Sequence, residues 1–142
     1  MISQTARYAL RIIGFLADHR GQRVSGREIA SATGIPANYL SKILNQLRKS
    51  GLVLSQKGWG GGFVLREDKV GVPISEVLEA INERPETSEC MFELRSCDAD
   101  NPCPLHDHWE RIRGELTSML QHVRLGDLAS ESRREGKPHF FW

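Results

Sequence analysis

The sequence predicts a mainly α-helical chain that carries one small β-hairpin, and three observations support this fold class. Apolar residues recur at helical spacing from residue 4 to residue 49, with short polar interruptions. A glycine-rich stretch at residues 57–62 separates two short runs that are typical of β-strands. Between residues 105 and 125, apolar residues alternate at intervals of three and four, the pattern of a long helix that pairs with another helix.

The first two predicted helices cover residues 4–18 and 26–33. The apolar stripe of the first comprises Ala6, Leu10, Ile13 and Ala17. The second begins after Ser25, a favourable N-cap, and Glu28 three residues later completes the pattern of a capping box. Gly34 ends this helix, because glycine readily adopts the left-handed conformation that follows a helix C-terminus.

A third helix begins at Pro36, which is tolerated in a first helical turn, and its apolar stripe comprises Leu40, Ile43, Leu44 and Leu47. The tight turn at residues 33–35 gives the second and third helices the spacing of a helix-turn-helix. Two strands, predicted at 52–56 and 63–66 and joined by a flexible glycine tip, add a β-hairpin. A helix-turn-helix followed by a hairpin is a winged helix, which we assign to residues 1–70.

The rest of the chain has a different organisation. We predict a fourth helix over 73–82, a loop over 86–104 and a long helix over 105–125. Residues 71–129 would therefore form a linker helix, a ligand-binding loop and a dimerisation helix. Residues 130–142 are charged with an aromatic end, and we expect them to form a mobile tail.

Five apolar residues of the long helix form the predicted dimer interface: Trp109, Ile112, Leu116, Met119 and Val123. Their alternating spacing is typical of a coiled-coil seam. The alternative is that this face packs on the core of its own chain. The regular spacing favours a partner helix, most simply from a second copy, and hence a homodimer.

The charge distribution indicates what the first part of the chain binds. Residues 1–70 carry 11 Lys and Arg against 4 Asp and Glu, whereas residues 71–142 carry 8 against 14. The net charge of +1 therefore conceals a basic half joined to an acidic half. A basic half is typical of nucleic-acid binding, although solvated charges can also be distributed this way by chance.

A polar face of the third helix supplies most candidate DNA-binding residues: Asn38, Tyr39, Ser41, Lys42, Asn45, Arg48 and Lys49. Asparagine pairs with adenine, lysine with guanine, and serine with either base edge or phosphate. In the wing we add Lys57, Gly60 and Gly61, because a lysine neutralises phosphate and glycines let backbone N–H groups approach it. The alternative is an ordinary solvated surface. For Trp59 we leave open whether it covers the hairpin or contacts a partner.

Three cysteines lie within fourteen residues of one loop and are followed by a histidine: Cys90, Cys97, Cys103 and His106. In a cytosolic chain this pattern indicates metal binding or redox chemistry rather than structural disulfides. Three thiolates and an imidazole suit a four-coordinate site for zinc or an iron–sulfur cluster. Structural zinc sites usually use cysteine pairs two to four residues apart, which are absent, so the wider spacing favours a larger inorganic core.

Other functional classes are excluded by the lack of their patterns. No apolar run approaches the roughly 18 residues that cross a bilayer, and no signal peptide opens the chain, so we expect a cytoplasmic protein. No P-loop, dinucleotide-binding glycine pattern or nucleophile–base pair is present, so we expect neither an enzyme nor an electron-transfer protein, and no small-molecule substrate.

The chain resembles the iron–sulfur winged-helix transcriptional regulators typified by IscR and NsrR. The resemblance covers nearly all of residues 1–129. It rests on the sequence Arg-Tyr-Ala-Leu at 7–10, on residues 39–53 of the third helix, on the wing at 57–63 and on the three cysteines. It implies a dimeric repressor or other DNA-binding regulator in which each subunit carries one cluster and a long helix crosses between subunits.

The resemblance also bears on the fourth ligand. In IscR-like proteins a histidine just after the third cysteine completes a 2Fe–2S site, and His106 stands there. In some NsrR-like proteins an acidic residue of the partner's first helix serves a 4Fe–4S cluster, but the matching residue here is Arg7, which cannot ligate. The resemblance thus favours 2Fe–2S, although the gap before Cys97 and the residues Pro104 and Leu105 depart from the IscR pattern.

We therefore expect a homodimer that binds double-stranded operator DNA under the control of a cluster that senses redox state, oxygen, nitric oxide or iron–sulfur supply. The alternative is a cluster-free regulator of the same fold that depends on thiols or zinc.

Overall fold

The computed structural model describes residues 2–84 and 89–129, so the predicted tail lies outside the described residues. The chain is mostly helical with one two-stranded antiparallel hairpin, which confirms the predicted fold class. The elements are α1 (Gln4–Asp18), α2 (Gly26–Thr33), α3 (Ala37–Lys49), β1 (Val53–Gln56), β2 (Gly62–Leu65), the 3₁₀ turn η1 (Glu67–Lys69), α4 (Ser75–Ala80), α5 (His106–His122) and the 3₁₀ turn η2 (Leu125–Leu128).

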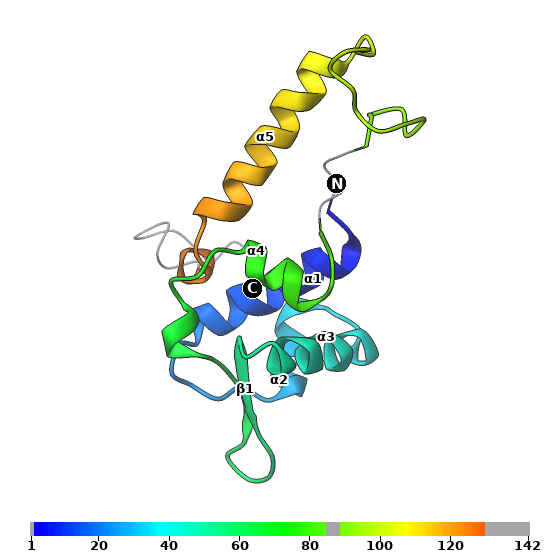
Figure 1. Cartoon of the computed structure of the whole chain (residues 1–142). Helices are drawn as coiled ribbons and strands as arrows, with labels where there is room; N and C mark the ends of the chain where they lie inside the picture. The colour runs from blue at the N-terminus through cyan, green and yellow to red at the C-terminus, as the bar shows by residue number, and fades with distance from the viewer. Residues whose placement is uncertain (1, 85–88, 130–142) are drawn as a thin grey trace.

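Helix α1 lies at the centre of the molecule, with α2 and α3 on one side and α4 and η2 on the other (Figure 1). Its buried face includes Ile12, Ile13 and Leu16, which are almost completely shielded from solvent. Burying each such side chain contributes about 1.5–3 kcal/mol. One hydrophobic cluster joins this face to α2, α3, the hairpin, α4 and the end of α5. The core thus holds the helix-turn-helix and the hairpin in a common frame.

The helix-turn-helix is defined by local capping. The Ser25 hydroxyl accepts a hydrogen bond from the Glu28 N–H at 3.1 Å, and the Glu28 carboxylate accepts one from the Ser25 N–H at 2.9 Å, as the capping box predicts. Gly34 caps the C-terminus of α2 with φ of 70°. Pro36 is the N-cap of α3 rather than a residue of its first turn, because its ψ of 136° is still extended while its carbonyl accepts from Leu40 N–H.

The wing is attached to the segment before α2. Strands β1 and β2 pair from Val53 with Leu65 to Gln56 with Gly62. A further bridge joins Val24 to Phe63. The distance from the Val24 nitrogen to the Phe63 carbonyl oxygen is 2.9 Å, and that from the Phe63 nitrogen to the Val24 carbonyl oxygen is 2.7 Å. A Cβ on Gly62 would lie 2.5 Å from the Val24 carbonyl oxygen, so this close approach requires glycine.

Helices α4 and α5 are both shorter than predicted, and one contact explains where α4 starts and where α5 ends. Pro73 and Arg124 form an antiparallel bridge, and the Ile74 N–H donates to the Val123 carbonyl at 2.9 Å. Residues at this bridge are extended, so α4 begins at Ser75 and α5 ends at His122. The predicted ranges 73–82 and 105–125 were therefore too long.

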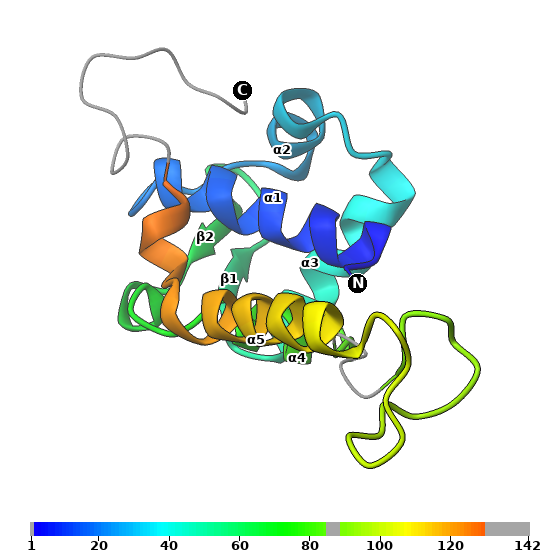
Figure 2. The same ribbon diagram turned by 90° about the horizontal axis from the view of Figure 1, so that it is seen from above.

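Helix α5 stands away from the body, and the cysteine loop extends beyond its first turn (Figures 1 and 2). The residues of the predicted dimer interface have different surroundings. Leu116 and Val123 pack against the protein's own core, and Val123 lies past the helix end. Ile112 and Met119 are 47% and 43% exposed. The buried apolar residue of α5 is Leu120, which the predicted interface did not include.

None of the helices among the described residues is both long enough and apolar enough to cross a membrane.

Candidate functional site

The predicted base-contacting face of α3 is exposed to solvent. Four apolar side chains bury the opposite face of this helix in the core: Leu40, Ile43, Leu44 and Leu47. The predicted candidates of α3 all lie on the exposed face: Asn38, Tyr39, Ser41, Lys42, Asn45, Arg48 and Lys49. Lys57 and Gly60 of the wing are exposed too, and Gly61 is half-buried.

A groove of about 830 Å³ separates α3 from the wing and brings four of these candidates together. Ser41, Asn45 and Arg48 line it from α3, and Lys57 lines it from the wing. The Arg48 guanidinium donates to the Asn45 side-chain oxygen at 2.7 Å, so these two polar groups are held side by side. The groove therefore presents cations and hydrogen-bonding groups on one concave surface, which suits the phosphates and base edges of DNA.

Arg27 of α2 also lines this groove, although it is not among the predicted DNA-binding residues. Its side chain is exposed in the first turn of α2, a helix for which no DNA contact was predicted. A Cβ on Gly26, the residue before Arg27, would lie 3.7 Å from the Phe63 ring of the wing, so the start of α2 lies beside the wing, which no local sequence pattern indicates.

Tyr39 lies at the edge of the α3 face and contacts α1. Its ring centroid is 6.2 Å from that of Tyr8, and the Arg11 guanidinium carbon lies 5.7 Å from the Tyr8 centroid. Such ring and cation contacts are individually weak. They hold Tyr39 in one place while about half of its surface remains exposed.

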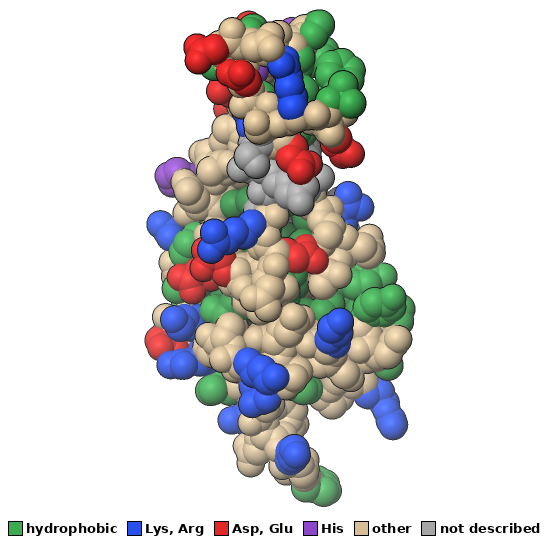
Figure 3. Space-filling view, turned by 45° about the vertical axis from the view of Figure 1, so that its right-hand side comes forward, with side chains coloured by type: hydrophobic (Ala, Val, Ile, Leu, Met, Phe, Trp, Pro, Cys, Tyr) green, Lys and Arg blue, Asp and Glu red, His purple; other side chains and the backbone are tan. Residues whose placement is uncertain are grey.

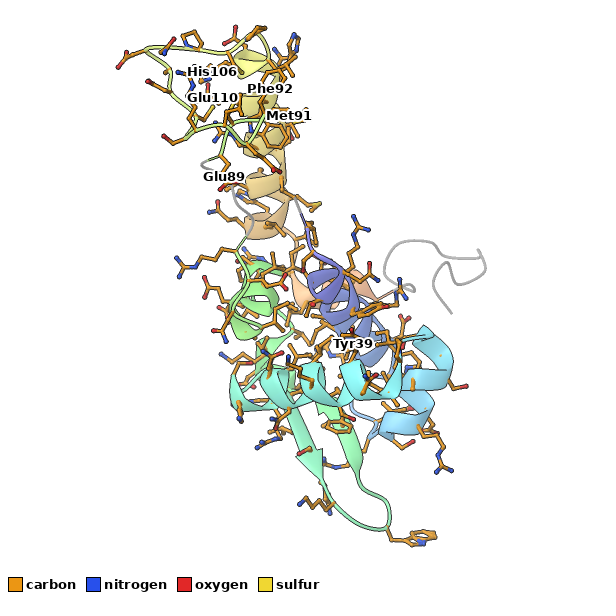
Figure 4. The ribbon with its side chains drawn as sticks, turned by 90° about the vertical axis from the view of Figure 1, so that its right-hand side faces the viewer. Tyr39, Glu89, Met91, Phe92, His106 and Glu110 are labelled. Atoms are coloured by element: carbon orange, nitrogen blue, oxygen red, sulfur yellow. The ribbon has the colours of Figure 1, made fainter. Side chains whose placement is uncertain are left out.

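The three cysteines and His106 form two close pairs at the start of α5. The Cys90 and Cys103 sulfurs are 3.6 Å apart, and the Cys97 sulfur is 3.2 Å from His106 Nδ1. All three cysteines are free thiols. Cys90 and His106 are buried, and Figure 4 shows His106 and Glu110 together at this end of the molecule, far from Tyr39.

Hydrogen bonds within the loop hold these pairs in place. Glu89 and Ser96 form a bridge, and the Cys90 N–H donates to the Arg95 carbonyl at 3.1 Å. The Trp109 indole N–H donates to the Glu89 carbonyl at 2.8 Å and so joins the start of the loop to α5. The His106 N–H donates to the Cys103 carbonyl at 3.0 Å. The first and last cysteines are thereby brought to the same helix end.

The surroundings of Cys90 favour its thiolate. The Phe92 backbone N–H lowers the pKa of the Cys90 thiol below its ordinary value, against the opposing effect of burial. The Cys103 thiol and the positive charge of Arg95 lower this pKa further. Because the thiolate is the form that binds metals, Cys90 is suited to be a ligand.

The arrangement of these donors is that of two pairs rather than one group of four. No set of three or more His, Cys, Asp or Glu side chains among the described residues is grouped around one point as a single metal ion requires. A tetrahedral zinc site needs all four ligands around one ion, whereas a cluster of two irons takes its ligands two to each iron. Three thiolates and one imidazole are donors that suit either kind of centre.

The groove and the cysteine loop carry opposite charge. In Figure 3, Asp and Glu side chains gather at the loop end, whereas Lys and Arg side chains predominate toward the wing end. The basic half of the sequence is thus also the basic half of the surface, as nucleic-acid binding requires.

Comparisons with known proteins agree with this architecture. Residues 2–131 match the model of the Rrf2 family, which is described as an iron-dependent transcriptional regulator. An HTH-type transcriptional regulator of Aquifex aeolicus is 32% identical over 130 residues, which cover 90% of each chain. The transcriptional regulator IscR of Escherichia coli is 32% identical over 103 residues, which cover 72% of this chain but only 63% of IscR. The structure of CymR, the global cysteine regulator of B. subtilis, is similar with a TM-score of 0.73 and 28% identity, covering 92% of this chain and 96% of CymR.

Proposed function

Because the chain belongs to the Rrf2 family of transcriptional regulators, we propose that it is a homodimeric regulator whose affinity for operator DNA is controlled by a 2Fe–2S cluster. Members of this family are regulators and not enzymes, as the sequence predicted. The cluster would be held by Cys90, Cys97, Cys103 and His106. The observation that carries the proposal is the presence of these four side chains, as two close pairs beside the start of α5, on a chain that also has a basic winged helix.

The groove supports the assignment of the DNA-binding surface. Helix α3 would enter the major groove with Ser41 and Asn45 toward the base edges, because recognition helices of this kind place polar side chains there. Arg27, Arg48 and Lys57 would meet phosphates on either side of the groove. Asn38 and Lys42 lie on the same exposed face and extend it toward the start of α3.

The position of the four ligands suggests how a cluster would affect DNA binding. When bound, a 2Fe–2S cluster supplies a one-electron redox centre that also reacts with oxygen and nitric oxide. Its ligands belong to both the loop and α5, so binding all four would fix the loop against the helix. Among the described residues, the C-terminal half of α5 packs on the core through Leu116 and Leu120. Ordering the loop would therefore set the direction of α5 relative to the winged helix.

In a homodimer this direction would decide the spacing of the two recognition helices. Half-sites lie about 34 Å apart for each turn of DNA, so a small change in spacing affects both contacts. We assign the dimer contact to the exposed part of the predicted seam, Ile112 and Met119, with Trp109 at its start. Couplings of this kind typically change affinity about 5- to 150-fold.

The proposal is tested by purifying the protein without oxygen and measuring visible absorption and operator affinity. We expect a coloured protein, and we expect Cys97→Ser to lose the colour and change operator affinity by at least about 5-fold while the dimer persists. His108→Ala is the matched control, because His108 is an exposed histidine on α5 outside both pairs, and it should keep the spectrum. Equal operator affinity with and without cluster, at one salt concentration, would contradict the sensor role.

A cluster-free thiol regulator is the second candidate, favoured by one comparison. CymR, whose fold is similar, is described as a global cysteine regulator. If the protein purified without oxygen is colourless and contains no iron, while thiol oxidation changes its operator affinity, this second function is the correct one.

A further inference from the structure

The tip of the wing presents one tryptophan to solvent. The Trp59 side chain is 100% exposed, the highest value among the large hydrophobic side chains of the described residues. It therefore does not cover the hairpin. At a projecting tip, such a ring is free to contact a partner.

The backbone of the tip keeps this ring directed outward. The Gly61 N–H donates to the Gly58 carbonyl at 3.1 Å and closes a four-residue turn with Trp59 in its second position. Gly60 follows with φ of 70°, the left-handed conformation that a type II turn requires in its third position. A Cβ on Gly61 would collide with the Gln56 carbonyl oxygen. The tip thus has one compact conformation, and Trp59 is its projecting side chain.

The neighbouring residues indicate which partner this ring meets. Lys57, two residues before Trp59, lines the basic groove beside α3. Two residues of chain span at most about 7 Å, so Trp59 lies close to Lys57, and the Val24–Phe63 bridge holds the hairpin beside α2. With α3 in a major groove about 12 Å wide, a tip that passes the phosphate at Lys57 reaches the adjacent minor groove.

The chemistry of the indole then decides what the tip reads. Its ring is flat and apolar, and its N–H can donate a hydrogen bond but cannot accept one. A·T pairs present only acceptors in the minor groove, whereas G·C adds the guanine 2-amino donor. The indole N–H can therefore donate a hydrogen bond to an acceptor of an A·T pair, whereas at a G·C pair it also meets the guanine 2-amino group, which is itself a donor.

We propose that Trp59 inserts into the minor groove beside the site of α3 and makes this protein prefer A·T over G·C pairs beneath the wing. This inference rests on the proposed DNA-binding function. It adds a specificity-determining residue that carries no charge and does not line the protein groove between α3 and the wing.

The test uses the full-length protein and an operator duplex enriched by the wild-type protein from a random pool. Hydroxyl-radical footprinting of wild type and Trp59→Ala identifies the base pairs beneath the tip. Those pairs are then replaced by G·C, or by inosine·cytosine, which lacks the 2-amino group of the minor groove but keeps the major-groove pattern of G·C. We expect G·C to weaken wild-type binding about 10-fold and inosine·cytosine to restore it, since one wrong pair typically costs this much.

Two variants separate the ring from its N–H. Trp59→Phe should bind all three duplexes equally, because the apolar ring remains and the donor is lost. Trp59→Ala should weaken binding to all of them and leave the salt dependence of binding unchanged. Lys57→Ala is the control, and it should lower the slope of log affinity against log salt by about one. Neither Trp59 variant should change thermal unfolding, since the side chain touches nothing within the protein.

Three outcomes contradict the inference: G·C tolerated by wild type, inosine·cytosine as weak as G·C, or a Trp59→Ala variant that dimerises differently from wild type. The last would place Trp59 in a contact between copies of the chain. A wild-type protein that enriches no duplex at all would instead contradict the proposed DNA-binding function itself.

Discussion

Two glycines of the wing show how a single residue position can control a surface. Gly61 and Gly62 both lie where a Cβ would meet backbone, at the Gln56 carbonyl in one case and the Val24 carbonyl in the other. Backbone atoms cannot move aside as a flexible side chain does. The sequence predicted a flexible tip for this glycine run. In the structure, Gly61 and Gly62 are instead required by close packing, and the approach at Gly62 attaches the wing to the segment before α2.

Gly61→Ala should separate the two strands of the wing at Gln56 and destabilise the protein by about 1–3 kcal/mol, the usual cost of a strained backbone position. Denaturation in urea measures the loss. Operator affinity should fall as well, because Lys57 and Trp59 move with the strands. Gly71→Ala is the matched control, since a Cβ there has nothing within 4 Å and no positive φ. Equal stability of the two variants would contradict this account.

Helix α2 shows what an element of the helix-turn-helix depends on. It has 8 residues, fewer than the roughly 12–15 that form an isolated helix in water. Its stability comes from the Ser25–Glu28 capping box, from Gly34 and from the burial of Ile29 in the core. Because Val24 pairs with the wing, the start of α2 also fixes the wing relative to α3.

Ser25→Ala removes the acceptor for the Glu28 N–H and should lower the free energy of unfolding by about 0.5–2 kcal/mol. Chemical denaturation followed by circular dichroism measures this change. Ser31→Ala serves as the control, because Ser31 is an exposed residue within the same helix and alanine is the better helix former there. If both variants unfold alike, the cap does not contribute as described.

At the scale of the whole molecule, α5 connects two distant sites. The groove and the cysteine loop lie at opposite ends of the protein, and α5 spans much of the distance between them (Figure 1). Leu125, which follows α5, is completely buried against the core and anchors that end. The exposed Ile112 and Met119 are the apolar side chains of this helix that the protein's own core does not cover.

Replacing Ile112 and Met119 together with glutamate should produce a monomer in analytical ultracentrifugation. Two unpaired charges would otherwise be buried between subunits, which costs several kcal/mol. Both residues are exposed within one protomer, so the fold itself should persist by circular dichroism.

Arg111→Glu makes the same change in net charge on a neighbouring exposed position and should leave the dimer intact. A wild-type protein that is itself monomeric at micromolar concentration would contradict the proposed dimer.

Local sequence is sufficient to place much of this protein. The bounds of α1 and α2, the apolar face of α3 and the β-hairpin follow from caps, turns and spacing, because each depends on residues close in the chain. The four candidate ligands were recognised for a similar reason: their residue types and short spacing limit the chemistry that they can perform.

Contacts between distant segments decided the rest. Residues 72–74 pair with 123–125, which set the start of α4 and the end of α5 and placed Val123 against the core of its own chain. The folding of the loop decided that Cys90 faces Cys103 and that Cys97 faces His106. The approach of α2 to the wing added Arg27 to the groove. Helical periodicity describes one segment at a time, so it carries no information about a backbone hydrogen bond that a remote segment provides. Such hydrogen bonds lie at the start of α4 and at the end of α5.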